Sequence, residues 1–387
     1  MAPRRNPTLS EDLISEILVR VPVKPLLCFQ SVSKTWLSLI KHPAFVKSQL
    51  RHALETNQNL IMSLYKEDTM METNLNVDQG NRLFQLNVDS RKIVADLKGV
   101  FLNSYLYTLV GSANRIVCVA VDDLESSMYL WNPAIRECKL IPDFIKFGGP
   151  FGFGYDRVDD DYKVISTTGY PFDVSVGVYS VKRNVWRKLP EPIEEPHFDV
   201  CVNGFFYGIG RNGMMTFDLN KELFNHSIKL PIIDYDYGND VTRIIEFNNS
   251  IAVIQVWAHG LNGDVAVEGL KKKINIWTLD GDACLRVGGG EVSWTLMFSI
   301  DLAMPRYLIF GYFSNNNLLL SIRTPSITEN DCVWILCDAH KKEAKLIPPS
   351  IIMPDHHCIQ NVFKYSESLV SLPGFKQVNW NAGEDTS

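Results

Sequence analysis

The sequence predicts a multidomain α+β protein in which a small helical domain precedes a larger, mainly-β domain. Apolar residues recur at helical spacing up to about residue 50, whereas short apolar runs separated by Asn, Asp and Gly follow Asn57. Hydrophobic residues make up 46% and charged residues 21% of the 387 residues, a balance typical of folded globular chains.

The charge balance argues against nucleic acid and membrane partners. The chain has 38 Lys+Arg against 44 Asp+Glu, a formal net charge of −6, whereas proteins that neutralise phosphates usually carry a basic surplus. No apolar run approaches the roughly 18–20 residues that span a bilayer. We therefore expect neither nucleic acid nor a membrane as a partner.

The cysteines and the N-terminus predict the compartment. The eight cysteines are scattered without a C-x-x-C pair, so they read as small buried side chains in a reducing environment. The residues that follow Met1–Arg5 lack the apolar stretch of a secretory signal. We expect a cytoplasmic protein, a nuclear protein, or one found in both places.

Capping residues and prolines divide the first fifty residues into helices. Ser10 is a natural N-cap, and the helical run that it opens stops at Pro22. Pro25 can open a second short helix, and Ser33 caps a third. A fourth helical segment covers residues 43–54.

This helical region carries more apolar side chains than it can bury by itself. Domains below about 40 residues rarely stand alone without a disulfide, a metal or a partner. A surplus apolar face either packs on the rest of the same chain or marks an interface with another protein. The residues that form the surplus are Leu9, Leu13, Ile17, Pro22, Val23, Leu26 and Trp36.

The segment from Leu9 to Trp36 also carries an ordered set of motif residues: Asp12-Leu13, Ile17-Leu18, Pro22-Val23-Lys24, Leu26 with Phe29, and Val32-x-Lys34-x-Trp36. These residues resemble an F-box of the plant type. The departures from that pattern are Ser10 for a proline, Val21 for a leucine and Cys28 for an arginine.

The resemblance implies that the helices dock on a Skp-family adaptor and, through it, on cullin and RING subunits. Leu13, Leu27 and Val32 could instead face inward within the helical cluster. The residues expected to bind the adaptor are Leu9, Leu13, Ile17, Leu18, Pro22, Leu26, Leu27, Val32, Lys34 and Trp36.

The remainder of the chain repeats one unit: a strand, a polar turn, a second strand and a proline exit. Hairpin turns such as Asn203-Gly204 lie between these units. Alternating hairpins at intervals of about 50 residues predict a β-propeller, with six blades or alternatively seven. A plain β-sandwich is the alternative architecture. Examples of the unit are Leu130–Pro142, Val178–Pro190, Thr216–Pro231 and Leu336–Pro348.

These units resemble the kelch-like F-box-associated domain of plant F-box proteins. Arg115 stands where that family commonly has glycine, which predicts a differently bent turn. The matching stretches are Gly152–Asp156, Asp160–Val164, Val202–Gly204, Ser293–Thr295 and Ser366–Val370. The expected organisation is an F-box domain over 1–50, a helical end and linker over 51–58, the propeller over 59–380 and a disordered tail over 381–387.

Two patterns imitate chemical sites. Gly208–Gly213 fits G-x-G-x-x-G, but the strand-like run after it cannot supply the helix N-terminus that a phosphate needs. The consecutive residues His356-His357-Cys358 alternate in direction on a strand and cannot converge on one ion. We expect no catalytic residue, cofactor or metal.

The predicted function is target recognition in a Skp-cullin-F-box ubiquitin ligase. The helices would hold the adaptor while the propeller binds an unidentified protein destined for ubiquitination and proteasomal degradation. Two alternatives stay open: an adaptor-binding scaffold that promotes no ubiquitin transfer, and a propeller enzyme with convergent acidic or metal-binding residues in its channel.

Overall fold

The computed structural model describes most of the chain in segments. These are residues 9–56, 59–66, 82–87, 90, 92–97, 107–121, 127–142, 150–168, 175–190, 198–210, 213–231, 241–248, 250–258, 271–280, 292–303, 309–314, 317–323, 332–338, 343–347 and 357–377. His356 and the expected tail, 381–387, lie outside them.

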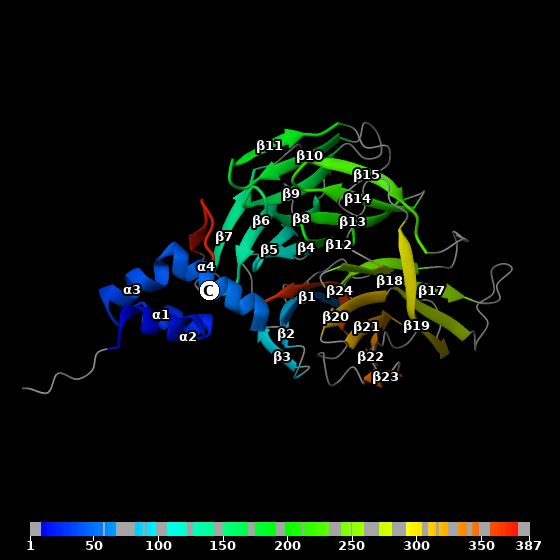
Figure 1. Cartoon of the computed structure of the whole chain (residues 1–387), viewed down its shortest axis with the longest axis horizontal. Helices are drawn as coiled ribbons and strands as arrows, with labels where there is room; N and C mark the ends of the chain where they lie inside the picture. The colour runs from blue at the N-terminus through cyan, green and yellow to red at the C-terminus, as the bar shows by residue number, and fades with distance from the viewer. Residues whose placement is uncertain are drawn as a thin grey trace, which may run out of the picture.

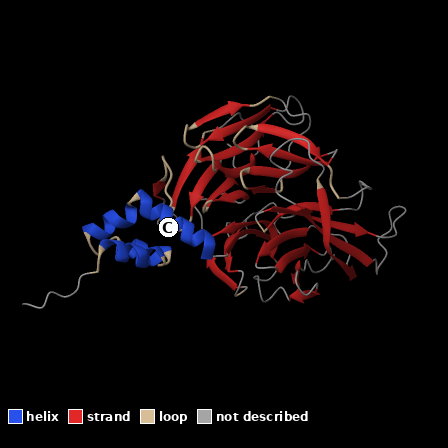
Figure 2. Cartoon of the chain, in the orientation of Figure 1, coloured by secondary structure: helices blue, strands red, loops and turns tan. Residues whose placement is uncertain are grey.

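Four helices form one group beside the strands (Figures 1 and 2): α1 (Glu11–Val19), α2 (Val23–Phe29), α3 (Lys34–Lys41) and α4 (Pro43–Thr56). We call α1–α4 the head. The predicted helices are confirmed, and the three helices expected in the F-box region are joined by a fourth that runs to Thr56. α4 continues because Phe45, Gln49 and Ala53, spaced four residues apart, form one buried face. None of the described helices is long and apolar enough to cross a membrane.

The strands that follow pair as antiparallel sheets in six groups. In chain order the first half comprises β1 (Asn59–Lys66), β2 (Arg82–Asn87), β3 (Lys92–Asp96), β4 (Tyr107–Ala113), β5 (Ile116–Val121), β6 (Met128–Asn132), β7 (Glu137–Ile141), β8 (Pro150–Asp156), β9 (Asp161–Thr168), β10 (Ser175–Ser180), β11 (Val185–Lys188) and β12 (Val200–Val202). The second half comprises β13 (Phe205–Gly210), β14 (Gly213–Asp218), β15 (Leu223–Ile228), β16 (Val241–Phe247), β17 (Ser250–Ala258), β18 (Lys271–Asp280), β19 (Ser293–Ala303), β20 (Ile309–Ser314), β21 (Asn317–Arg323), β22 (Cys332–Asp338), β23 (Glu343–Ile347), β24 (His357–Tyr365) and β25 (Lys376–Gln377).

The sheets form a closed ring. Sheet 1 has the order β24-β1-β2-β3, so the last long strand pairs beside the first. Sheets 2 to 6 start at β4, β8, β12, β16 and β20, and β25 adds a fifth strand to sheet 2. The innermost strands contact one another around the whole circle, including β20 with β24 and β24 with β4. This radial arrangement is a β-propeller, as predicted, and the sandwich alternative is wrong.

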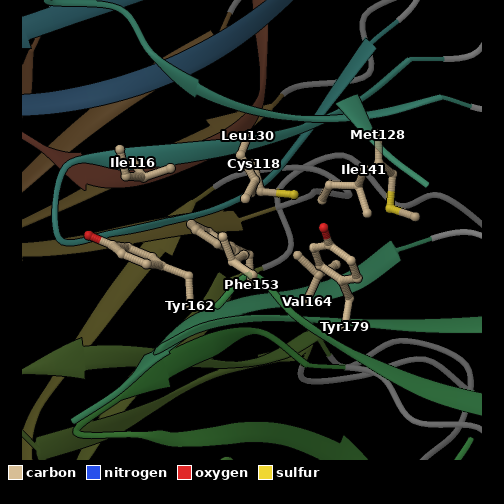
Figure 3. Close-up of a cluster of buried hydrophobic side chains, with 10 residues drawn as sticks. Ile116, Cys118, Met128, Leu130, Ile141, Phe153, Tyr162, Val164 and Tyr179 are labelled. Atoms are coloured by element: carbon tan, nitrogen blue, oxygen red, sulfur yellow. The ribbon is translucent and has the colours of Figure 1, made fainter. Parts of the chain in front are cut away.

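The propeller core lies between neighbouring sheets. Figure 3 shows the cluster between sheets 2 and 3, where Cys118 and Leu130 face Phe153, Val164 and Tyr179. Similar clusters join sheets 1 and 2, sheets 3 and 4, and sheets 4 and 5. Sheets 2, 3 and 4 therefore bury both faces, which explains the apolar runs in their sequences.

The hairpin turns use left-handed backbone at their tips. Asn114 and Arg115 have φ of 42° and 71°, and Asn203 and Gly204 have φ of 54° and 84°. Both pairs match the turn that suits the twist of a hairpin. The expectation that Arg115 bends its turn differently is wrong, since Arg115 adopts the conformation that glycine takes in the equivalent turn.

The glycine-rich motif is a hairpin and not a phosphate loop. Gly208 and Gly210 lie on β13, and Gly213 begins β14, paired with Gly210. Gly213 has φ of 134°, and a Cβ there would lie 2.7 Å from the carbonyl oxygen of Ile228. Glycine is therefore needed for backbone conformation and close packing.

Candidate functional site

An apolar stripe runs along one side of α1. Ser10 caps this helix, with its hydroxyl accepting from the backbone N–H of Leu13 at 3.4 Å. Leu9 lies just before the cap residue, and Leu13 and Ile17, four residues apart in α1, lie on one helix face. Their side chains are 58%, 49% and 53% exposed. We call these three residues the α1 stripe.

Other apolar residues of the head are buried in a cluster that includes two residues of the propeller domain. Leu18 and Leu26 are 3% and 0% exposed and belong to one apolar cluster with Ile40 of α3. The same cluster includes Ile135, from the β6–β7 turn, and Leu369, which follows β24. Full burial stabilises a leucine side chain by about 1.5–3 kcal/mol, so this contact fixes which side of the head faces outward.

The predicted adaptor-binding residues differ in their exposure. Leu18 and Leu26 are buried within the chain in this conformation. Helical spacing places residues on a common face but does not say which face meets solvent. Conversely, Leu13 and Val32, considered possible inward-facing residues, are 49% and 63% exposed.

The other predicted residues occupy intermediate places. Pro22 and Lys34 are exposed. Leu27 and Trp36 are half-buried at the edge of the head cluster, where the Trp36 ring meets Phe29 edge-on with centroids 5.4 Å apart. The structure therefore leaves Leu9, Leu13, Ile17, Pro22, Val32 and Lys34 open to a partner.

Acidic side chains border the α1 stripe. Glu11 and Asp12 lie in the first turn of α1, where carboxylates favour the positive end of the helix dipole, and Glu16 lies one turn further on. All three are exposed. An apolar centre with a charged rim is the composition of a protein-docking surface.

Sequence reasoning missed the residues that join head and propeller. Ile135 was predicted to lie in a polar hairpin turn. Leu369 lies in Ser366–Val370, a stretch that resembles the F-box-associated domain but was given no role. Lys24 Nζ of α2 also lies 3.9 Å from a carboxylate oxygen of Glu367. The surplus of apolar residues in the head was the available signal, but it did not reveal which of them pack on this chain.

The described residues present a binding surface and no set of metal-ligating groups. Among them, no three His, Cys, Asp or Glu side chains are grouped to hold an ion. The head with its exposed α1 stripe and the propeller together define the class of protein. It is a protein-binding chain with a small docking domain and a large ring-shaped domain.

Comparison with known proteins places this class in a family. Residues 7–48 match the F-box domain, and residues 69–372 match the F-box associated beta propeller domain. The chain belongs to the F-box associated beta propeller family, and the predicted resemblance to plant F-box proteins with this domain is confirmed.

Two relatives from Arabidopsis thaliana illustrate the similarity. One F-box/kelch-repeat protein is 30% identical over 244 residues, covering 59% of this chain and 62% of the relative. A second F-box/kelch-repeat protein is 24% identical over 387 residues, covering 94% of this chain and 98% of the relative. The chain thus spans less than two thirds of the first relative and nearly all of the second. Among solved structures, a chain of the nidogen/laminin complex matches with a TM-score of 0.44 and 11% identity, covering 81% of this chain and 99% of that chain.

Proposed function

We propose that this chain is the target-recognition subunit of a Skp-cullin-F-box ubiquitin ligase. The head would bind a Skp-family adaptor, which links it to cullin and RING subunits. The propeller would hold a target protein for ubiquitination and proteasomal degradation. The chain would contribute binding and position, and the transfer chemistry would belong to other subunits.

The observation that carries the proposal is the two-sided head. Leu18 and Leu26 are buried in the apolar cluster that the head shares with Ile135 and Leu369 of the propeller domain, while the α1 stripe is exposed. Exposed apolar residues grouped inside a charged rim usually mark a protein interface. F-box membership identifies the kind of partner that would cover this stripe.

The propeller topology supports separate places for adaptor and target. The head contacts the β6–β7 turn, at the end of the ring that carries tight connections such as 114–115 and 203–204. At the opposite end, the strand pairs β1–β2 and β17–β18 are joined through longer stretches of sequence than those turns. Binding specificity usually resides in such loops, so we assign target binding to the end away from the head.

Position alone is enough for the proposed role. Holding a target beside a ubiquitin-charged enzyme turns an encounter between free molecules into one within a complex, at an effective concentration up to the millimolar range for short connections. The gain depends on geometry, because misplacement of reacting groups by about 1 Å can lower a rate by about 10²-fold.

A reconstituted transfer assay tests the role. The full chain is used to capture proteins while the proteasome and ligase are blocked, and a captured protein is then incubated with the complete ligase. We expect ubiquitin transfer that requires this chain and is lost with Leu13→Asp and Ile17→Asp together. Capture and adaptor binding without transfer would favour the scaffold alternative. Full-length variants are preferable to deleting residues 1–57, which would uncover Ile135 and Leu369.

We also propose that each of the six sheets counts as one blade. Contacts between neighbouring innermost strands around the circle support that number. The number matters for function, because it sets how many loop pairs line the target-binding end.

The expected cytoplasmic or nuclear location remains a proposal. Burial raises the pKa of the Cys118 thiol, which keeps it protonated and unreactive as a core side chain. Imaging a tagged full chain would test the location directly.

A further inference from the structure

The chain following β24 runs from sheet 1 to sheet 2 and contributes to the apolar cluster of the head. In Figure 1 it is the red segment beside β7 and the helices. Leu369 enters the head cluster, and β25 pairs with β7 through Lys376 opposite Cys138 and Gln377 opposite Glu137. We call residues 366–377 the C-terminal strap. It contacts both the head and the propeller.

Asn132, the last residue of β6, is hydrogen-bonded to this strap. Its side chain is fully buried. Its Oδ1 accepts from the N–H of Ala134 at 3.0 Å, which shapes the β6–β7 turn. Its Nδ2 donates to the carbonyl oxygens of Ser368 at 3.0 Å and Val370 at 2.8 Å. One side chain therefore joins the turn that contacts the head to the strap.

The residues that end the third strand of other sheets show that this hairpin turn does not require a side-chain amide. Asp218, which ends β14, accepts from the N–H groups of Asn220 and Lys221 at 2.9 and 3.0 Å. Ser180, which ends β10, accepts from the N–H of Arg183 at 3.1 Å. An acceptor satisfies each turn, so the donor group of Asn132 serves another purpose.

A second asparagine, Asn87, lies in sheet 1, whose strand β1 directly follows α4 of the head. Asn87, which ends β2, accepts from the N–H of Ser90 at 2.8 Å in the same manner. Its Nδ2 donates to Oδ1 of Asn59 at 2.8 Å. Asn59 begins β1, just after α4. Among these four strand ends, the amides occur at the two sheets that carry the connections to the head.

We propose that Asn132 is a positioning residue: by fixing the C-terminal strap between the head and the propeller, it sets the angle between the α1 stripe and the propeller. Domains joined by small interfaces usually move relative to each other. The strap adds apolar contact at Leu369 and hydrogen bonds such as that from Gln377 Nε2 to the carbonyl of Ile135 at 3.2 Å. The consequence for ubiquitin transfer rests on the proposed function, whereas the fixed angle does not.

Asn132→Asp separates the two jobs of this side chain. Aspartate keeps the acceptor for the Ala134 N–H, but it removes the donors and turns a carboxylate toward two carbonyl oxygens. Asp218→Asn is the matched control, because it makes the reverse exchange at the equivalent position of sheet 4. Leu369→Ala is a second test, which weakens the apolar half of the same joint.

Pulsed electron spin resonance on the full chain measures the angle directly. Spin labels are attached to p-acetylphenylalanine at Lys47 in α4 and at Arg183 in the β10–β11 turn, both exposed positions. We expect one narrow distance distribution for the unsubstituted chain and the control, and at least a twofold broader one for Asn132→Asp and Leu369→Ala. A folded Asn132→Asp chain with an unchanged distribution would overturn the proposal. If that variant does not fold, an unchanged distribution in Leu369→Ala would overturn it.

A second readout connects the angle to transfer. In the reconstituted ligase, the chain's own lysines serve as the acceptor probe, and the modified sites are mapped by mass spectrometry. We expect Asn132→Asp to bind the adaptor within about twofold of the unsubstituted chain and to spread modification over more lysines. An unchanged pattern together with a broadened distance distribution would overturn the link to transfer. Loss of adaptor binding by every chain would instead contradict the proposed function.

Discussion

At the scale of single residues, the ring is held by a buried charged group as well as by apolar packing. Lys163 of sheet 3 is 3% exposed, and its Nζ lies 2.9 Å from Asp156 and 3.1 Å from Glu222 of the turn in sheet 4. The same Nζ donates to the carbonyl oxygen of Leu219 at 2.7 Å. The ammonium group therefore links two neighbouring sheets and neutralises carboxylates on both.

Removal of this ammonium group should destabilise the propeller strongly. Lys163→Met would leave the buried Asp156 carboxylate without its counter-charge, while Glu222 would keep its ion pair with Arg187. Loss of one partner from a buried pair costs about 3–5 kcal/mol. Urea unfolding followed by tryptophan fluorescence measures the loss. Lys188→Met, at an exposed position, is the control and should shift stability by no more than about 0.5 kcal/mol. Equal stabilities of the two variants would show that the network is unimportant.

The same network predicts a specific acid sensitivity. Burial raises the pKa of Asp156, but hydrogen bonds from Lys163, Asn220 and the backbone outweigh it, so the pKa lies below the ordinary value of 3.8. Protons therefore bind the unfolded chain more tightly, and the stabilisation is present above pH 3.8 and lost as the pH falls through the folded-state pKa. We expect Asp156→Asn to flatten this part of the acid-unfolding curve. A curve of unchanged slope would contradict the assignment.

At the scale of elements, helix caps give an internal comparison. Ser33 Oγ accepts from the N–H of Trp36 at 3.1 Å, whereas Ser10 Oγ accepts from Leu13 at 3.4 Å. Hydrogen bonds weaken with distance, so the cap of α3 is the stronger one.

Ser33→Ala should therefore destabilise the head more than Ser10→Ala. A lost serine cap costs about 1 kcal/mol, and we expect α3 to approach that value and α1 to fall below it. Hydrogen exchange measured by mass spectrometry on α1 and α3 separates the two effects. The predicted order would be contradicted if Ser10→Ala accelerated exchange in α1 more than Ser33→Ala accelerated exchange in α3, each relative to the unsubstituted chain.

The elements also show how far sequence reasoning reaches. Caps and periodicity predicted the helices, and polar turns predicted the hairpins, because these signals act between residues near in sequence. Leu26 is buried in a cluster that also contains Leu369 of the propeller domain, whereas Leu13 lies outside that cluster and is exposed, and periodicity alone does not predict this difference. Asn132 had a visible role in its turn, but its donors serve a strap more than 200 residues away in sequence.

At the scale of the whole molecule, the first strand of the propeller pairs with its last long strand. β24 pairs with β1 in sheet 1, and the strap then returns to the head. The hairpin repeats predicted a propeller, but the pairing that closes it joins residues at opposite ends of the sequence. Contacts of this kind close long loops, so they form at high entropic cost and depend on the complete chain.

Ring closure predicts different effects for two truncations. Removal of residues 357–387 deletes β24 and leaves the inner edge of β1 unpaired, so we expect loss of the cooperative thermal transition. Removal of residues 378–387 leaves β24 and β25 in place, and the transition should persist. Circular dichroism during heating distinguishes these outcomes, and cooperative unfolding of both truncated chains would contradict closure through β24.

The most direct test of the proposed role is the affinity of the full chain for a purified Skp-family adaptor. Replacement of interface anchors often costs 2 kcal/mol or more each, so Leu13→Asp with Ile17→Asp should weaken binding by roughly 100-fold or more. Val158→Asp changes a side chain that is 77% exposed in the propeller and should leave the affinity unchanged. Calorimetry that finds binding unaffected by the substitutions in α1, or weakened equally by Val158→Asp, would contradict the α1 stripe as the adaptor-docking surface.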